Sequence, residues 1–463
     1  MGVPINVNYR YQSNELIYLL DNSDSEAVFY QGCYADQVKK IRDDLPKVRA
    51  WIQLEDSTPL LEGSHAYSDI VKTTSPMPRI DRNEDNIYML YTGGTTGMPK
   101  GVMYTHGGFV TSMLKTLKGM GIDVPDELKD LKKTILNLHE NGELAKSLVA
   151  CPLMHGTGMW LGGFLAHLLG GCVVTTPNLG LDCKLLWEEV EKVGVTNIII
   201  VGDSFAKPMV KELDRAVAEN KPYNLRTLKL IYSSGVMFSA DVKASLLEHH
   251  DMVLMDAMGS SEGGMGSSVT TREDGSATAK FRLNPGVVVV SDEGEEVLPG
   301  SGVRGLIGTS GLVPEGYYKD KEKSDATFKE FNGTRYSFPG DYALVEADGT
   351  ITLLGRGSNC INSAGEKIYP EEVEEALKLN IHVYDSLVVG LPDERFGNKV
   401  VAVISLAENC EINEADLISS TREHLSGYKL PKSIIFVPEV MRAPNGKADY
   451  KWAKKIAEDA LVS

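Results

Sequence analysis

Between about residues 87 and 261, short apolar segments alternate with amphipathic ones, and this alternation constrains the fold of the chain more than any other feature. Apolar runs of strand length cover residues 87–91, 148–153, 172–175, 197–201, 228–232 and 252–255. Segments with apolar residues at helical spacing lie at residues 183–193, 205–217 and 240–249. Such alternation predicts a layered α/β domain with a largely parallel sheet, in which ligands bind at the carboxyl ends of the strands.

After about residue 277 the pattern changes to strands joined by glycine-containing turns, and 463 residues are too many for one core. We expect strands at 287–290 and 305–309, a hairpin over 343–354, and then an α+β unit from residue 357 to the end. In that unit we expect helices at 371–377, at 415–425 and from 449, with strands at 386–389, 400–404 and 434–437. The sequence therefore predicts an α/β fold with two domains. The first, residues 1–355, is large and combines layered α/β subdomains with a β-rich subdomain, and the second, residues 356–463, is small.

The charge balance argues against whole classes of partner. The chain carries 47 basic and 64 acidic residues, a formal charge of -17, whereas nucleic acids and anionic membranes attract cationic surfaces. The six cysteines are scattered, without metal-like spacing, which predicts reduced thiols. The most apolar stretch, residues 158–174, is interrupted by His167 and several glycines, so we expect a buried helix and strand there. We find no signal peptide, and we predict a cytoplasmic protein whose oligomeric state stays open.

A dense loop of glycine and threonine follows the apolar strand at 87–91. Glycines let the backbone turn tightly, and the amides, hydroxyls and Lys100 point donors at an anionic ligand. A Walker A loop needs glycine directly before its lysine, and here Met98 and Pro99 intervene, which disfavours a P-loop ATPase. The candidate ATP-binding residues in this loop are Thr92, Gly93, Gly94, Thr95, Thr96, Gly97 and Lys100.

This loop resembles the phosphate-binding signature of the adenylate-forming enzymes, which include acyl-CoA synthetases, peptide adenylation domains and beetle luciferases. Further signatures follow in the expected order. The segment from Asp256 to Glu262 resembles the aromatic-Gly-x-Thr-Glu motif, with Met258 in place of the adenine-stacking tyrosine. The resemblance implies that Glu262 holds Mg²⁺ and that Ser261 contacts phosphate, since carboxylates are suitable hard-oxygen ligands. It also assigns Ser234, Gly235, Val236, Asp256, Met258 and Gly259 to AMP, Asp341 to the ribose hydroxyls, and Arg356 to ribose or phosphate.

The end of the chain resembles the family's Pro-x-Gly-Lys loop, which makes Lys447 the expected catalytic lysine. Its ammonium would stabilise charge at the α-phosphorus during adenylation. Family members rotate the small C-terminal domain between their two half-reactions, and Ser358 stands at the hinge position. Ser363, Ala364 and Gly365 would then line the tunnel for coenzyme A. Family members usually carry a further segment before the strand expected at Val3–Val7, so we expect the N-terminal portion to be shortened.

The acyl pocket is expected around the segment that follows residue 151, where His155 aligns with the family's gate residue. Trp160, Val201, Gly202, Met237 and Phe238 complete mostly apolar walls. Such walls suit a hydrophobic carboxylate and disfavour an amino acid, although Asp203 could serve as partner for an ammonium group. The sequences of residues 202–205 and 363–370 are similar to those of bacterial synthetases that act on fatty acids or steroid side chains.

The resemblance thus implies an ATP- and Mg²⁺-dependent acyl-CoA synthetase. Glu262, His155 and Lys447 are its candidate catalytic residues, and its expected substrates are coenzyme A and a small molecule, namely a hydrophobic carboxylic acid of the fatty or steroid-side-chain type. Two alternatives stay open at this point: a non-catalytic remnant that binds nucleotide or acyl-AMP, and an adenylation enzyme that loads a carrier protein.

Overall fold

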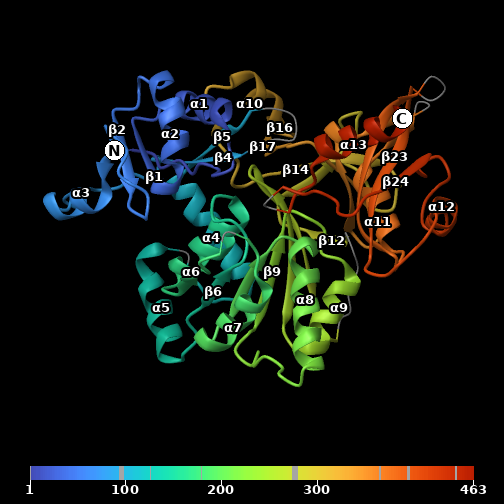
Figure 1. The fold of residues 1–463 in the computed structure, drawn as a ribbon, viewed down its shortest axis with the longest axis horizontal. Helices are drawn as coiled ribbons and strands as arrows, with labels where there is room; N and C mark the ends of the chain where they lie inside the picture. The colour runs from blue at the N-terminus through green and yellow to red at the C-terminus, as the bar shows by residue number, and fades with distance from the viewer. Residues whose placement is uncertain are drawn as a thin grey trace. The chain divides into compact units, whose positions relative to one another are not determined.

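The computed structural model describes residues 2–92, 98–125, 127–178, 180–273, 280–363, 366–393, 397–443 and 446–462. It divides into two compact units (Figure 1). The first unit extends to Met120 and includes Leu312–Phe328, and the second consists of Gly121–Gly311 and Lys329 to the end. The predicted boundary between domains, at residues 355 and 356, stays a prediction.

The first unit contains two small sheets, β1–β2–β3 and β15–β5–β4, and several short helices. Strands β1, β2 and β3 pair in parallel, and Leu19, Ile41 and Trp51 are buried against them. Its elements are α1 (Ser13–Asn22), β1 (Ala27–Gln31), η1 (Gly32–Tyr34), α2 (Ala35–Ile41), η2 (Arg42–Asp44), β2 (Ala50–Leu54), β3 (His65–Ala66), α3 (Tyr67–Thr73), β4 (Ile87–Thr92), β5 (Lys100–Thr105), α4 (His106–Gly119), β15 (Gly316–Tyr317) and α10 (Lys321–Thr327).

The prediction of a strand at Val3–Val7 is wrong. The segment forms neither helix nor strand, and its alternating side chains Ile5 and Val7 instead pack against the core of the first unit. Alternation of apolar residues predicts that every second side chain is buried. A segment can bury those side chains without pairing to a neighbouring strand.

The second unit is organised by one long sheet. Its elements before residue 361 are η3 (Leu128–Asp130), α5 (Leu131–Glu140), β6 (Lys146–Val149), η4 (Thr157–Phe164), α6 (Leu165–Leu168), β7 (Cys172–Val174), α7 (Cys183–Val193), β8 (Asn197–Ile200), α8 (Asp203–Ala218), β9 (Leu230–Ser234), α9 (Ala240–His249), β10 (Val253–Ser260), β11 (Gly263–Thr270), β12 (Lys280–Leu283), β13 (Val287–Val290), β14 (Arg304–Thr309), β16 (Phe328–Phe331), β17 (Thr334–Ser337), β18 (Asp341–Val345), β19 (Thr350–Arg356) and η5 (Gly357–Asn359).

Strand direction changes along this sheet. Strands β7, β6, β8, β9 and β10 pair in parallel in that order, as the alternation of strands and helices predicted. From β10 onward the neighbours β11, β12, β19, β18 and β14 pair antiparallel. The β-rich part expected after residue 277 is therefore continuous with the parallel part through the hydrogen bonds of β10 and β11.

Two of the three helices predicted between the parallel strands have the expected bounds, and α8 extends over Asp203–Ala218 rather than 205–217. The side chain of Asp182 accepts a hydrogen bond from the amide of Leu185 at the start of α7, and Gly194 ends that helix at φ 71°. Helices α7 and α9 have the predicted bounds, and α8 and α9 lie side by side (Figure 1). The strand expected at 148–153 ends earlier, at Val149, because the chain folds back on itself. A Cβ at Gly158 would lie only 2.5 Å from the carbonyl oxygen of Pro152.

The stretch 158–174 folds as predicted into helical turns, η4 and α6, followed by the strand β7, but the strand is not buried, since Cys172 is exposed and Val173 and Val174 are half-buried. Within the described residues, no helix has the length and apolarity that a bilayer crossing requires. All six cysteines are free thiols in the structure.

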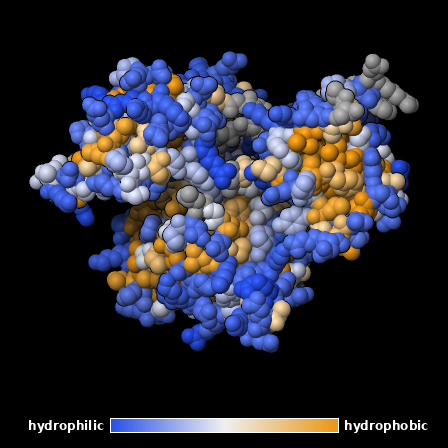
Figure 2. All heavy atoms as spheres, viewed as in Figure 1, coloured by the Kyte–Doolittle hydropathy of each residue, from blue (hydrophilic) through white to orange (hydrophobic). Residues whose placement is uncertain are grey.

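Residues 361–462, which we call the small lobe, have sheets of their own. The elements of the lobe are β20 (Ile361–Ser363), β21 (Glu366–Ile368), α11 (Pro370–Lys378), β22 (Val383–Asp393), β23 (Gly397–Leu406), α12 (Glu414–Thr421), β24 (Ser433–Phe436) and α13 (Tyr450–Val462). Neighbouring residues on β22 enter different cores: Val388 joins Leu377 of α11, whereas Leu387 joins Ala453 of α13. Both faces of the sheet are therefore covered, which explains the continuous apolar runs of β22 and β23. Figure 2 shows apolar residues over the face of this lobe that the view presents.

A buried ion pair joins α9 to the parallel part of the long sheet. Nζ of Lys243 lies 3.8 Å from a carboxylate oxygen of Asp256, and the two side chains are only 1% and 6% exposed. The same nitrogen lies 5.1 Å from the ring centroid of Phe238. Loss of hydration raises the pKa of Asp256 to about 7, against the opposing effect of Lys243. Removing one partner therefore leaves the other charge buried without compensation.

We expect Lys243→Met to lower the free energy of unfolding by about 3–5 kcal/mol. The double variant Lys243→Met/Asp256→Leu should recover most of that loss, because an apolar pair carries no desolvation penalty. Urea unfolding followed by circular dichroism measures both. Lys280 forms an exposed pair with Asp348 at 2.9 Å, so Lys280→Met is the matched control, with an expected loss below about 1 kcal/mol. Equal losses in Lys243→Met and in this control would contradict a structural role for the buried pair.

Candidate active site

Two turns of the long sheet bring together the carboxylates that the sequence selected. Glu262 lies in the turn between β10 and β11, is 7% exposed, and donates its amide hydrogen to Oγ of Ser260 at 3.2 Å. Asp341 and Arg356 face each other in register on β18 and β19, and Nε of Arg356 donates to Oδ1 of Asp341 at 3.4 Å. The charge of Glu262 also contributes to the raised pKa of Asp341, after loss of hydration. The two carboxylates therefore act in one electrostatic environment.

One oxygen of Asp341 stands out. Its Oδ2 is buried, and within the described part of the chain it makes no hydrogen bond. A buried acceptor without a partner is costly unless a ligand supplies the missing donor. This carboxylate oxygen therefore marks a position at which a bound hydroxyl or amine would be stabilised.

Lys447 belongs to the same group of charges. Its side chain keeps an exposed face, yet loss of hydration lowers the pKa of its ammonium, and the positive charge of Arg356 lowers it further. The carboxylates of Glu262 and Asp341 act in the opposite direction and raise this pKa. The structure thus brings together four of the predicted residues, from the β10–β11 turn, from β18 and β19, and from the last loop of the small lobe.

The loop that carries Lys447 lies directly on the turn between β8 and α8. Gly446 has φ 73°, and a Cβ there would lie 2.4 Å from Oγ of Ser204 and 3.3 Å from Cγ1 of Val201. The amide of Ala443 donates to the carbonyl of Lys447 at 2.9 Å, which closes the loop. Glycine is required at position 446 both by its backbone conformation and by this close approach.

The candidate acyl-pocket residues gather near the same turn. Gly202 has φ 55°, and a Cβ there would lie 2.2 Å from the carbonyl oxygen of Met237. At Gly235, with φ 96°, a Cβ would lie 3.8 Å from a methyl group of Val201. Phe238, which the sequence placed in the same wall, is fully buried beside Lys243.

His155 and Trp160 come from the segment that leads into η4. A Cβ at Gly156 would lie 3.3 Å from the ring of Trp160. Burial lowers the pKa of His155 to about 4, and the nearby charge of Lys447 contributes to this shift. His155 therefore lies in the field of the lysine loop and is uncharged at neutral pH.

Asp203 is occupied by protein partners. Its Oδ1 accepts a hydrogen bond from the amide of Ser239 at 2.9 Å, and its charge acts on Lys207 and Lys243. These contacts give its carboxylate a structural task at the start of α8, which weakens the case for it as a partner of a substrate ammonium.

Several predicted nucleotide residues have other neighbours in the structure. The carboxylate of Asp256 pairs with Lys243, and Met258 is buried in a core cluster with Met265 and Ile307. Ser234 is buried at the end of β9, whereas Gly259 is exposed and Ser261 half-buried near the end of β10. Their assignment to AMP stays a prediction.

The threonine-rich loop belongs to the first unit. Thr92 and Lys100 are paired in register at the ends of β4 and β5, so the loop connects two antiparallel strands, unlike a P-loop, which leads into a helix. Nζ of Lys100 lies 3.6 Å from Asp320 and 5.4 Å from the ring centroid of Tyr317. Gly93, Gly94, Thr95, Thr96 and Gly97 lie outside the described residues.

The predicted hinge lies where the chain leaves the long sheet for the small lobe. Gly355 has φ 113°, and a Cβ there would lie 2.3 Å from Oε2 of Glu371, whose Oε1 accepts from Nδ2 of Asn359 at 3.4 Å. The side chain of Ser358 lies outside the described residues, as do Ala364 and Gly365, and Ser363 is buried on β20. The roles of these residues stay predictions.

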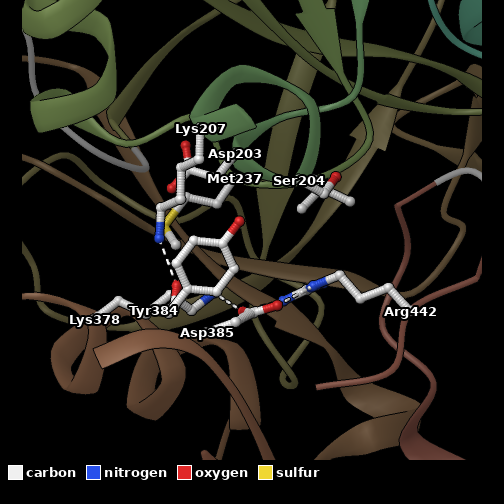
Figure 3. Close-up of a pocket in the computed structure, with 9 residues that line it drawn as sticks. Asp203, Ser204, Lys207, Met237, Lys378, Tyr384, Asp385 and Arg442 are labelled. Carbon is white, nitrogen blue, oxygen red and sulfur yellow. Dashed lines mark hydrogen bonds and ion pairs between the residues drawn. The ribbon is translucent and has the colours of Figure 1, made fainter. Parts of the chain in front are cut away.

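Lys207, Asp385 and Arg442 were not among the site residues predicted from the sequence. They line a small pocket where α8 meets the small lobe (Figure 3). Arg442 stands five residues before Lys447 and carried a usable signal, a guanidinium within the terminal motif itself. Lys207 and Asp385 gave none, because only the tertiary structure brings them near the loop.

We expect nuclear magnetic resonance titration to give His155 a pKa of about 4, well below the ordinary 6.5. Because the folded state resists protonation, the stability that depends on this residue should fall as pH drops from 6.5 through 4. The spectrum of His155→Gln assigns the resonance among the nine histidines. In Lys447→Ala the pKa of His155 should rise, since a neighbouring positive charge is removed. A wild-type pKa near 6.5 would place His155 in water and away from Lys447.

Comparison with known proteins identifies the family of this chain. The family model described as AMP-binding enzyme matches residues 2–318, and the model described as AMP-binding enzyme C-terminal domain matches residues 372–447. The 3-oxocholest-4-en-26-oate–CoA ligase of Rhodococcus rhodochrous is 40% identical, over 98% of this chain and 82% of its own length. A medium/long-chain-fatty-acid–CoA/3-oxocholest-4-en-26-oate–CoA ligase of Mycobacterium tuberculosis is 41% identical, over 99% of this chain and 83% of its own length.

Solved structures show the same fold. The anthranilate–CoA ligase AuaEII, in complex with anthranoyl-AMP, has a TM-score of 0.80 at 20% identity, over 100% of this chain and 84% of that one. ATP-bound MatB from Rhodopseudomonas palustris has a TM-score of 0.79 at 21% identity, over 99% of this chain and 84% of that one. The predicted fold class, family and enzyme class are thereby confirmed. The chain belongs to the AMP-binding enzyme family and is an acid–thiol ligase of the acyl-CoA ligase type.

Proposed function

We propose that this enzyme activates a hydrophobic carboxylic acid, either a fatty acid or the side-chain acid of a steroid, and transfers it to coenzyme A. The observation that carries the substrate class is the 40–41% identity, over nearly the whole chain, to relatives named for such acids. The neutral His155 supports it, because burial lowers the pKa of this predicted gate residue to about 4 and leaves its imidazole uncharged at neutral pH. An uncharged pocket wall suits an alkyl or steroid chain.

The nucleotide would be held by the charges that gather around Asp341. Its buried Oδ2 lacks a donor, which a ribose hydroxyl would supply, and Arg356 beside it offers further donors to ribose or phosphate. We assign the phosphates to the loop from Thr92 to Lys100 and to Ser261. The adenine would lie along Ser234–Val236 and Met258–Gly259, with Asp256 beneath them.

The donors present fit Mg²⁺ through Glu262. Within the described residues no cluster of three or more His, Cys, Asp or Glu side chains could cage a metal. Mg²⁺ does not need one, because it binds proteins through one or two carboxylates and takes its other oxygens from phosphate and water. When bound, the ion would neutralise charge on the phosphates of ATP.

In the first half-reaction an oxygen of the substrate carboxylate attacks the α-phosphorus, and the bond to the β-phosphate oxygen breaks to release pyrophosphate. Little covalent work is left to the protein, so positioning and charge are its main contributions. The ammonium of Lys447 would stabilise the developing charge on the α-phosphate oxygens. In the second half-reaction the thiol of coenzyme A attacks the acyl carbon, and AMP leaves with the bonding electrons.

Between the two steps we propose that the small domain, 356–463, rotates against 1–355 at Ser358. The rotation would exchange the loop of Lys447 for Ser363, Ala364 and Gly365, which we assign to the pantetheine arm. A cytoplasmic location and the lack of nucleic-acid partners stay predictions.

A panel of acids tests the substrate class. With ATP, Mg²⁺ and coenzyme A, we expect acyl-CoA, detected by mass, from medium- or long-chain fatty acids or from 3-oxocholest-4-en-26-oate. Amino acids should give none, because their ammonium group would be left unpaired in an apolar pocket. Nucleotide binding without turnover of any acid would instead favour a non-catalytic remnant. Adenylation without release of acyl-CoA would favour loading of a carrier protein.

We expect Lys447→Ala to lower the rate of adenylation at least about 100-fold, since it removes an electrostatic stabiliser of the transition state. Transfer of the acyl group from pre-made acyl-AMP to coenzyme A should stay within about threefold of wild type, because the lysine is not used there. Pyrophosphate exchange measures the first step and a thiol assay the second. An equal loss of rate in both assays would contradict the proposal that different parts of the small domain serve the two half-reactions.

A further inference from the structure

Helix α8 and the small lobe meet where the side chain of Lys207 points toward Tyr384 (Figure 3). Nζ of Lys207 donates a hydrogen bond of 2.5 Å to the backbone carbonyl of Tyr384 on β22. The same nitrogen lies 5.0 Å from the ring centroid of that tyrosine. A cation that meets both a carbonyl dipole and an aromatic face is attracted by each. Lys207 thus fixes the start of β22 against α8.

The next residue of β22, Asp385, is gripped by the guanidinium of Arg442. Nε and Nη2 of Arg442 donate to the two carboxylate oxygens at 2.6 and 2.7 Å. Nζ of Lys378, at the end of α11, lies 3.5 Å from the same carboxylate. The side chains of Asp385 and Arg442 are only 17% and 13% exposed. Desolvation opposes the charge of Asp385, but Arg442 and Lys378 outweigh it and lower its pKa to about 2. The pair therefore stays ionised at neutral pH.

The third nitrogen of the guanidinium faces the other way, toward the catalytic loop. Nη1 of Arg442 donates to the carbonyl of Gly446 at 3.2 Å, directly before Lys447. A backbone bridge between Arg442 and Ala448 closes the loop around that contact. The rigid fork of an arginine can hold a carboxylate on one side and a carbonyl on the other, which the single ammonium of a lysine cannot do.

These contacts form one chain of interactions, from α8 through the backbone at Tyr384 and the carboxylate of Asp385 to the guanidinium and the loop. We propose that Arg442, braced by Asp385 and docked on α8 through Lys207, is the positioning residue that holds Lys447 in place for adenylation. The proposal rests on the proposed function, since it concerns the first half-reaction alone. Arg442 acts through the loop and is assigned no contact with substrate.

Four variants test whether Arg442 and its partners position the loop. Arg442→Lys keeps the charge but not the forked geometry, and Arg442→Ala removes both. Asp385→Asn removes the anion, and Lys207→Met removes the hydrogen bond to the backbone of Tyr384. Lys211→Met is the matched control. Lys211 lies one turn further along α8 and also pairs with the small lobe, with Glu408 at 2.5 Å, but the two side chains are 71% and 79% exposed. Such a pair contributes little.

Each variant is assayed for adenylation, by pyrophosphate exchange, and for transfer of the acyl group from pre-made acyl-AMP to coenzyme A. We expect kcat for adenylation to fall about 100-fold in Arg442→Ala and about 10-fold in Arg442→Lys, since small misplacements of a catalytic group are costly. Asp385→Asn and Lys207→Met should fall in the same direction, with KM for ATP unchanged within about twofold. Transfer from acyl-AMP should be kept, and the control should match wild type in both assays.

Three results would overturn the proposal. One is adenylation at the wild-type rate in Arg442→Ala, and another is a fall in Lys211→Met as large as that in Lys207→Met. The third is equal loss of both half-reactions in Arg442→Ala and Arg442→Lys, which would mean that the brace only supports the fold of the small lobe. Failure of the proposed function looks different, because the wild-type enzyme would then form no acyl-CoA from any acid of the panel.

Discussion

The candidate site depends on the close packing of backbone segments at one turn, which joins β8 to α8. The loop of Lys447 lies on the turn between β8 and α8, at Val201 and Ser204, and a Cβ at Gly446 would lie 2.4 Å from the serine oxygen. At Gly202, in the same turn, a Cβ would lie 2.2 Å from a carbonyl oxygen. Two glycines at φ 73° and 55° therefore allow three backbone segments to meet where a methyl group would not fit. The lysine that follows Gly446 lies in the field of Glu262 and Asp341.

The long sheet supplies the other half of the site because its strand direction changes at β10. The parallel strands β8 and β9 end on the turns that carry Val201 and Gly235, whereas β10 leads into the antiparallel hairpin that carries Glu262. Asp341 and Arg356 are paired in register on another antiparallel hairpin of the same sheet, β18–β19. Residues from both kinds of pairing thus enter one electrostatic group, with the carboxyl ends of parallel strands on one side of it, as is usual in α/β proteins.

Much of the fold and of the candidate site could be predicted from the sequence, because local residue patterns indicate those parts. Periodicity gave α7 and α9 with the correct bounds, and the resemblance of short segments to the motifs of adenylate-forming enzymes selected Glu262, Asp341 and Lys447, whose charges act on one another in the structure. Predictions were wrong or incomplete where tertiary packing decided. Val3–Val7 forms neither helix nor strand, and β10 continues to Ser260, beyond the strand expected at 252–255. Lys243 lies on the apolar face of α9 beside Leu246 and Leu247, so its position held a signal, but only the structure supplies its partner on β10.

Helices pack on both faces of the sheet in the small lobe, and this determines where its hydrophobic cores lie. Because β22 and β23 bury one row of side chains under α11 and the other under α13, the lobe encloses its apolar interior within its own residues. Its contacts with α8 include a hydrogen bond from Lys207 to a backbone carbonyl and an exposed ion pair between Lys211 and Glu408. Because both hydrophobic cores are made of the lobe's own residues, the internal packing of the lobe does not depend on the surface that lies against it.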